Sequence, residues 1–254
     1  MLALGQYTLD WMLALLLPLT RVSAFLLAAP IFPQSVINAR IRIAYSLFLC
    51  MLIFPAMAAP IRVPAEAPPL QSVFMEVLIG LAMALCLQVV SAAVALAGEQ
   101  ISQAVGLGFA QAFDPTVGST PVLSQMLNLV AMLVFLAMDG HVAVVAMVSE
   151  SLRALPPGSG ATVNLRSLID FCSVIFTGAV LISAPVVLAL LAVNLGVGAL
   201  SRATPSLNVF SVGFAISLIV GLGMLFLLIP VAATRMAEIW RSALSTLQAV
   251  SSGA

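Results

Sequence analysis

The chain has no lysine, only one histidine and few charged residues of either sign. Of its 254 residues 7% are charged, and nine acidic residues balance nine basic ones. With His141 as the only histidine an HExxH zinc motif is impossible, and without lysine a Walker P-loop is impossible as well. Neither GxSxG nor GxGD occurs. The sequence therefore predicts a protein that is not an enzyme and needs no cofactor.

Basic clusters and paired cysteines are missing too. The arginines are scattered singly or as the pair Arg40 and Arg42, whereas binding to nucleic-acid phosphates needs clustered cations. Nucleic acid is therefore not an expected partner. Cys50, Cys86 and Cys172 lie far apart in apolar stretches without CxxC spacing, so we expect packing thiols and no metal site.

Hydrophobic residues, by contrast, make up 63% of the chain. A helix needs about 20 apolar residues to span the hydrocarbon core of a membrane. Stretches of about this length or longer are Trp11–Phe32, Ile43–Ile61, Leu70–Ala97, Val122–Leu152, Leu168–Leu200 and Val209–Val231. Runs such as Ala131–Ala137 lack the alternation that a transmembrane barrel requires. We therefore expect an all-α, polytopic membrane protein of long, kinked helical hairpins.

Prolines and glycines divide these stretches. The prolines of Pro55–Pro69 predict an extended, stiff connector, because proline fixes φ and removes a helix donor. Arg153–Gly160 contains Pro-Pro-Gly and is typical of the tip of a helical hairpin. Pro185 predicts a kink in Leu168–Leu200, which is longer than one membrane thickness.

Three ionisable side chains, Arg21, Glu76 and Asp139, fall inside the apolar stretches. A charge at membrane depth costs at least roughly 2.5–3.5 kcal/mol on insertion scales, so each needs a reason. Glu76 is either a proton or ion relay, or a structural carboxylate at a helix end or paired with an arginine of another helix. For Arg21 we expect pairing with a carboxylate, in this chain or in a partner subunit.

Two short motifs predict how helices break and pack. Asp139-Gly140-His141 indicates a break where two half-helices meet. His141 is expected to be a hydrogen-bonded structural residue, the alternative being a pH sensor. The small residues of Ser91–Gly98 predict a face that another helix backbone can approach closely, in this chain or in another.

The segment Gly98–Pro121 interrupts the apolar sequence with glycine, glutamine and two phenylalanines. Apolar residues recur at every fourth position and predict one stripe on a helix. They are Ile101, Val105, Phe109 and Phe113. Gly106 and Gly108 each weaken such a helix by about 1 kcal/mol, and Asp114-Pro115 ends it. The pattern indicates a short, yielding element with aromatic tips.

A gate or plug explains this segment better than a helix lying on the membrane surface. Surface helices carry Lys or Arg on their polar face, and this segment has neither. A gate must pack in one state and move in another, which glycines and uncharged polar residues permit. We therefore interpret the segment as a movable obstruction.

Several motifs, taken in order, resemble the FliR/SctT family of type III secretion export-gate proteins, on its flagellar branch. The resemblance covers nearly the whole chain. Its motifs are Arg40–Leu47, Gly106–Pro115, Pro121–Leu129, Asp139–His141 and Asn194–Phe210. It implies a subunit of the flagellar export apparatus in the bacterial inner (cytoplasmic) membrane, at the flagellar basal body. Its implied partners are several copies of FliP and FliQ in a helical, conical gate, FlhB, membrane lipid and unfolded flagellar export substrates.

The resemblance also implies a division of the chain and a set of site residues. Residues 1–160 are expected to be similar to a FliP subunit, and residues 161–254 to a FliQ-like hairpin and tail. The segment that matches the family's pore plug is Gly106–Pro121. Within it the expected plug or gate residues are Gly106, Gly108, Phe109, Phe113, Asp114 and Pro115. The polar residues expected to serve assembly are Arg21, Glu76, Asp139, His141, Asn194 and Arg202.

Two other functions stay open from the residues alone. A small-molecule secondary transporter binds its substrate at broken helices, for which Pro185, Asn194 and the break at Asp139 are candidates. That function also predicts an internal repeat, of which only a loose echo is found. A purely structural scaffold is the other alternative.

Overall fold

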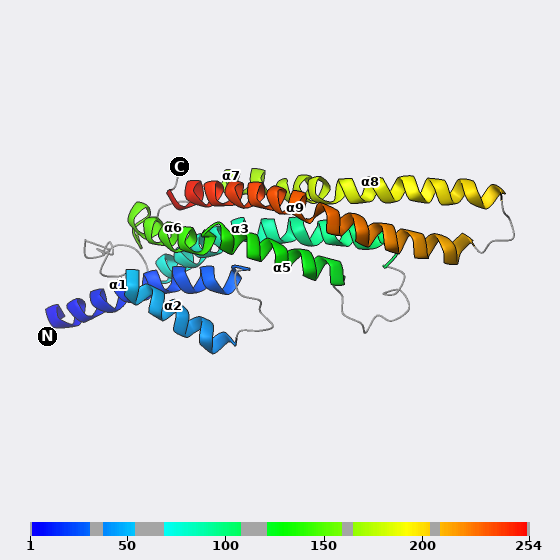
Figure 1. Ribbon diagram of the computed structural model, residues 1–254. Coiled ribbons are helices and arrows are strands. Elements are labelled where there is room, and N and C mark those ends of the chain that lie inside the picture. Colours follow the sequence, from blue (N-terminus) through cyan, green and yellow to red (C-terminus); the bar gives the residue numbers. More distant parts are fainter. Residues whose placement is uncertain are drawn as a thin grey trace. The chain divides into compact units, whose positions relative to one another are not determined.

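A computed structural model describes residues 2–30, 38–53, 69–107, 121–158, 165–203 and 209–252 of the chain. All regular secondary structure in these ranges is helical (Figure 1). The helices are α1 (Leu2–Ala28), α2 (Ala39–Ile53), α3 (Pro69–Val105), α5 (Val122–Ala137), α6 (Gly140–Ala154), α7 (Leu165–Cys172), α8 (Val174–Ala203) and α9 (Val209–Ser252). The prediction of an all-α protein is confirmed for these residues.

Among the described residues, three helical segments are long and apolar enough to cross a membrane. They are Leu70–Val105, Arg166–Leu200 and Gly213–Ser251. The bent pair α5 and α6 adds a fourth if the pair counts as one crossing. The apolar portion of α1, Leu15–Ala28, is shorter than these. The chain is thus a polytopic membrane protein.

The chain forms two compact units, and each is described by itself. Unit 1 comprises Met1–Val89, Asp139–Cys172 and Arg241–Ala254, and unit 2 comprises Val90–Met138 and Ser173–Trp240. Helices α3 and α9 each contribute residues to both units. The division expected at residue 160 does not coincide with the boundary between the compact units. Each unit contains residues that precede residue 160 and residues that follow it. That division stays a prediction.

In unit 1, α1 packs against α2 and α3. A β-carbon at Gly80 of α3 would overlap the carbonyl oxygen of Arg21 and lie 3.0 Å from the β-carbon of Ala24. Glycine is therefore required where the two helices approach closely. The inner side of α1 buries Leu17, Val22, Phe25 and Leu26.

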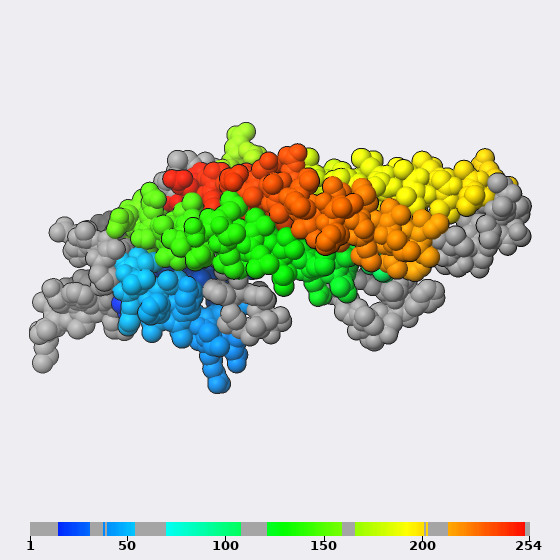
Figure 2. Space-filling view, in the orientation of Figure 1, coloured from blue at the N-terminus to red at the C-terminus, as the bar shows by residue number. Residues whose placement is uncertain are grey.

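Helix α2 has one buried side and one exposed side, and apolar residues occur on both. Its buried residues follow helical spacing and are Arg42, Ser46, Leu49, Cys50 and Ile53. Its outer side stands at the surface, where Figure 2 shows it in light blue. The large apolar side chains exposed there include Ile43, Phe48, Met51 and Leu52. An apolar outer face of this kind is suited to lipid or to another protein.

In unit 2, small residues bring α3 close to α5 and α8. A β-carbon at Gly98 of α3 would lie 2.5 Å from the α-carbon of Ser124 in α5. A β-carbon at Gly178 of α8 would lie 3.3 Å from the β-carbon of Ala93 in α3. The close packing predicted for Ser91–Gly98 is therefore made within this chain.

The apolar stretch Val122–Leu152 does not form one helix. α5 ends at Ala137 and α6 begins at Gly140. Asp139, between them, has a φ of 55°, in the left-handed region. The break predicted at Asp139-Gly140-His141 is confirmed. The long stretch Leu168–Leu200 is likewise divided, because a turn at Ser173 separates α7 from α8.

Helix α9 is continuous over 44 residues and passes through Pro230. The sequence predicts an apolar stretch that ends at Val231, yet the helix goes on to Ser252 because apolar residues continue to recur at helical spacing. These buried residues are Met236, Ile239, Trp240, Ala243, Leu247 and Val250. The opposite side carries the exposed ion pair between Arg235 and Glu238.

Candidate functional site

The most strongly built polar site among the described residues is the ion pair between Arg21 of α1 and Glu76 of α3. The Arg21 Nε lies 2.6 Å from the Glu76 Oε2, and the two side chains are only 1% and 2% exposed. Both residues belong to unit 1. Their sequence separation is 55 residues, so only the packing of α1 on α3 brings them together.

The remaining nitrogens of Arg21 reach the end of α6. Nη1 donates to the carbonyl oxygen of Ser151 at 2.8 Å, and Nη2 donates to that of Leu155 at 2.8 Å. The second oxygen of Glu76, Oε1, accepts a hydrogen bond from the backbone N–H of Gly158 at 3.3 Å. Three segments of the chain, α1, α3 and the end of α6, therefore meet at one buried cluster.

The sequence around Glu76 explains why the pair can form. Gly80 follows Glu76 by four residues and so lies on the same face of α3. The missing side chain at Gly80 lets the backbone of Arg21 come close. The guanidinium of Arg21 then reaches the carboxylate one turn away. A buried ion pair with additional hydrogen bonds meets the conditions under which charges are tolerated in a protein interior.

A second site lies in unit 2, where α3 ends at the segment predicted to be a plug. Ile101 and Val105, the first two residues of the apolar stripe, are each 1% exposed. Gly106 has a φ of 92°, which favours glycine, and a β-carbon there would lie 3.2 Å from the ring of Phe214 in α9. The other expected plug residues lie outside the described residues; they are Gly108, Phe109, Phe113, Asp114 and Pro115.

The far end of this segment joins the start of α5. Ser124 Oγ donates a hydrogen bond of 2.9 Å to the carbonyl oxygen of Ala95 in α3. This bond lies beside the close contact between Ser124 and Gly98. Each end of the segment is therefore packed against a helix of unit 2, the first beside α9 and the second against α3.

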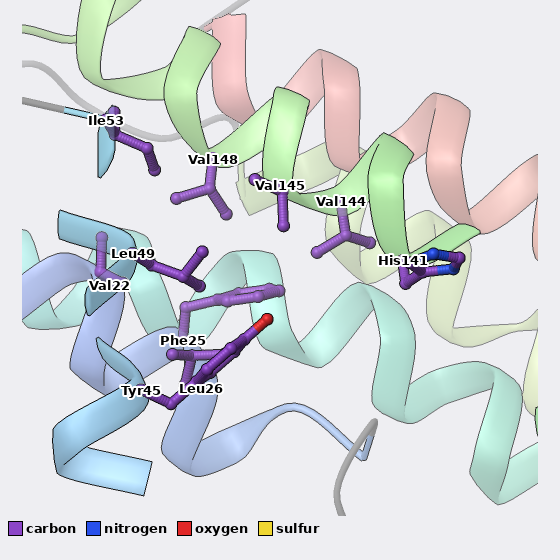
Figure 3. Close-up of a pocket in the computed structure, with 10 residues that line it drawn as sticks. All are labelled: Val22, Phe25, Leu26, Tyr45, Leu49, Ile53, His141, Val144, Val145 and Val148. Carbon is purple, nitrogen blue, oxygen red and sulfur yellow. The ribbon is translucent and has the colours of Figure 1, made fainter. Parts of the chain in front are cut away.

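The break at Asp139 places His141 beside a small cavity in unit 1. The cavity has a volume of about 50 Å³ and is lined by residues of α1, α2 and α6 (Figure 3). His141 lies at one end and is exposed, while Val144 and Val148 line the cavity from the next turns of α6. The lining is apolar except for His141 and Tyr45. Asp139 itself is exposed.

The last two polar candidates lie on α8. Asn194 Oδ1 accepts a hydrogen bond of 2.9 Å from Ser217 Oγ of α9, which ties the two helices of the hairpin together. Arg202 is exposed. A further pair that the sequence does not reveal joins α8 to α3, since Ser183 Oγ donates a 2.5 Å hydrogen bond to Gln100 Oε1.

The chain matches a known protein family over most of its length. The family described as "Bacterial export proteins, family 1" matches residues 12–243. The chain belongs to this family. A bacterial export protein with several candidate membrane crossings is a membrane component of an export apparatus.

Curated relatives of this export protein agree with the family. It is 32% identical over 230 residues to "Flagellar biosynthetic protein FliR" of Pectobacterium carotovorum subsp. carotovorum, a match that covers 87% of this chain and 86% of the relative. It is 30% identical over 239 residues to the protein of the same name from Escherichia coli (strain K12), covering 90% and 89%. The Bacillus subtilis (strain 168) protein of that name is 29% identical, covering 88% of each chain.

Some residues in the site of this bacterial export protein could not be found by sequence reasoning. Ser151 and Leu155 accept from Arg21 mainly through backbone carbonyls, which carry no sequence signal. The two glycines, by contrast, do have a local sequence signal. Gly158 follows two prolines, which indicates a turn, and Gly80 lies four residues after Glu76. In the described ranges no group of three or more His, Cys, Asp or Glu side chains is placed to hold a metal ion.

Proposed function

We propose that this bacterial export protein is a subunit of the flagellar type III secretion export gate. In this role it helps to form and close the pore through which unfolded flagellar proteins leave the cell. The likeness over 87% of the chain to a protein named for flagellar biosynthesis carries the proposal. Pore closure is assigned to Gly106–Pro121, with Phe109 and Phe113 as the aromatic obstruction.

The packing at both ends of the segment supports this assignment. α3 ends at Val105, and Gly106 then turns the chain beside Phe214. α5 starts at Val122, and its first turn is fixed to α3 through Ser124. A segment that obstructs a pore should be anchored at both ends. Mobile ends add conformational entropy that has to be lost each time the segment closes the pore. The described ends provide this anchoring.

The proposal includes an assembly with several copies of FliP and FliQ and with FlhB, in the inner membrane at the flagellar basal body. It is supported by the uneven cover of the candidate crossings. Within the chain 61% of the apolar window of Leu70–Val105 is buried, but only 33% of Arg166–Leu200 and 17% of Gly213–Ser251. The outer apolar surfaces of α8 and α9 are thus available to partner helices. The FliP-like region, residues 1–160, and the FliQ-like region, residues 161–254, belong to the same proposal.

Ion leakage and substrate export in living cells test the closing role. Phe109 and Phe113 are replaced by alanine, singly and together, and membrane conductance and secreted flagellar protein are measured. We expect greater leakage from the double variant. Phe74→Ala is the matched control, because Phe74 lies on α3 and not on the outer surfaces of α8 and α9, and is 60% exposed. Unchanged leakage together with normal export in the double variant would contradict the closing role.

The mass of the native complex tests the assembly separately. We expect the detergent-extracted chain to co-purify with FliP and FliQ at a mass far above that of one chain. A monomer that binds a small molecule would favour the transporter alternative instead.

A further inference from the structure

In the buried cluster at Arg21 and Glu76, all nitrogens of the guanidinium and both oxygens of the carboxylate are hydrogen-bonded within one chain. Each of the three guanidinium nitrogens of Arg21 donates at least one hydrogen bond within unit 1. Both carboxylate oxygens of Glu76 accept one, from Arg21 and from Gly158. Arg21 is 1% and Glu76 2% exposed among the described residues.

This arrangement is unsuited to carrying protons. To take up a proton, Glu76 must give up its charge while Arg21 stays charged, since arginine does not deprotonate in proteins. The guanidinium would then be a buried charge without a counter-charge, which is strongly unfavourable. The described carboxylates Glu99, Asp139, Glu150, Asp170 and Glu238 are all exposed. Glu76 is therefore the buried carboxylate among those whose surroundings the structure describes, and its partner Arg21 is equally buried.

The cluster instead determines where α6 ends. The last carbonyls of a helix have no partner within it, and a cation near them is favourable. Arg21 places its positive charge at this end and donates to the carbonyl oxygen of the C-cap residue Leu155. It also donates to the carbonyl oxygen of Ser151, which already accepts from the N–H of Leu155 at 2.9 Å. Glu76 holds the N–H of Gly158, whose φ of 79° turns the chain away from the helix.

We propose that Arg21 and Glu76 are positioning residues that act as one unit to fix the end of α6 against α1 and α3, and that neither carries protons during export. Gly80 belongs to the same unit, because it sets the distance between α1 and α3 at Arg21. The charges serve to make the cluster self-neutral. They specify one arrangement of three chain segments that are far apart in the sequence.

Hydrogen exchange of the native complex tests the positioning role. A longer peptide that contains Leu155 and Gly158 is followed in the wild type, in Glu76→Gln and Arg21→Gln, and in the variant with both changes. Only these two amides report between 155 and 158, because Pro156 and Pro157 have no N–H. We expect each single change to speed exchange in this peptide at least tenfold, because it leaves one charge unpaired. The double variant should exchange more slowly than either single one, because two amides can still bond without an unpaired charge. Trp240→Phe, in unit 2, is the control for general destabilisation and should leave this peptide unchanged.

Substrate export by the same variants, at matched complex levels, tests the absence of a proton role. We expect export to follow the exchange rate, so that the double variant exports at least tenfold more than Glu76→Gln. A Glu76→Gln protein that keeps slow exchange but loses export would show a proton relay and overturn the proposal. Normal export with fast exchange would overturn the positioning role. The export measurement rests on the proposed function, whereas the exchange measurement does not, so failures of the two are distinguishable.

Discussion

The indole Nε1–H of Trp240 in α9 donates a hydrogen bond of 3.0 Å to the backbone carbonyl oxygen of Ala131 in α5. Its ring centroid also lies 4.6 Å from that of Phe135, one turn further along α5. Both aromatic side chains are buried. The contact joins two helices of unit 2 through one polar and one aromatic interaction.

Replacing Trp240 should therefore separate these two contributions. Trp240→Phe keeps most of the apolar contact and removes the donor, which we expect to cost about 1 kcal/mol. Trp240→Ala also leaves a cavity and should cost about 3–5 kcal/mol. Thermal unfolding of the native detergent-extracted complex measures both. Phe74→Leu, at an exposed position of α3, is the control. Equal losses for the two Trp240 variants would mean that packing contributes nothing beyond the hydrogen bond.

Gly98 is expected to tolerate no side chain. A β-carbon there would lie 2.5 Å from the α-carbon and 2.8 Å from the nitrogen of Ser124, so the backbone of α5 must move. Gly98→Ala should cost about 1–3 kcal/mol, as over-packing does elsewhere. Nothing lies within 4 Å of a β-carbon built at Gly223, so Gly223→Ala should gain up to about 1 kcal/mol of helix propensity. The unfolding midpoint of the complex compares the two. A harmful Gly223→Ala would indicate that a partner covers this stretch of α9.

Asp139 is expected to accept only residues that tolerate the left-handed conformation. Its φ of 55° costs a β-branched residue about 1–2 kcal/mol. Asp139→Val should therefore lower the amount of intact protein in the membrane, whereas Asp139→Gly and Asp139→Asn should leave it unchanged. Immunoblots of membrane fractions, with and without added protease, measure this. Equal behaviour of all three variants would show that the backbone relaxes at this break without cost.

The hydrogen bond between Ser217 and Asn194 should contribute modestly to holding α8 to α9. Interhelical hydrogen bonds in membranes average roughly 0.6 kcal/mol, so Ser217→Ala should produce a small loss of that order. Ser245→Ala is the matched control, because the Ser245 hydroxyl donates only to Ser242 of its own helix. Resistance of the complex to chemical denaturation measures both variants. A loss of several kcal/mol for Ser217→Ala would place Asn194 in a larger polar network.

Helix type and the break at Asp139 could be predicted from this sequence, whereas the turn at Ser173 between α7 and α8 could not. Long apolar stretches predict helices and not strands. Asp139 and Gly140 both disfavour a helix, because Asp side chains bond to nearby backbone groups and Gly loses much backbone entropy. The apolar stretch Val209–Val231 covers only the first part of α9, for a physical reason. Uninterrupted hydrophobicity ends at Val231, but a one-sided apolar stripe continues, and helix formation needs only the stripe.

The partners of charged residues could not be predicted in the same way. Sequence reasoning marks Arg21 and Glu76 as costly charges that need a reason, yet their pairing depends on how α1 crosses α3. The backbone acceptors at the end of α6 depend on a third segment. Such contacts are set by tertiary packing, which local patterns do not encode. The proposed roles of Phe109 and Phe113 stay predictions, because both lie outside the described residues.

The interdependence of Arg21 and Glu76 has an evolutionary consequence. A lineage that loses either charge alone passes through an ancestor with an uncompensated charge in its interior. Across the bacterial export proteins the two positions should therefore change together, with arginine and carboxylate both kept or both replaced. The substitution history of one position is then readable from the other. Two sites 55 residues apart in the chain are in this sense inherited as one character.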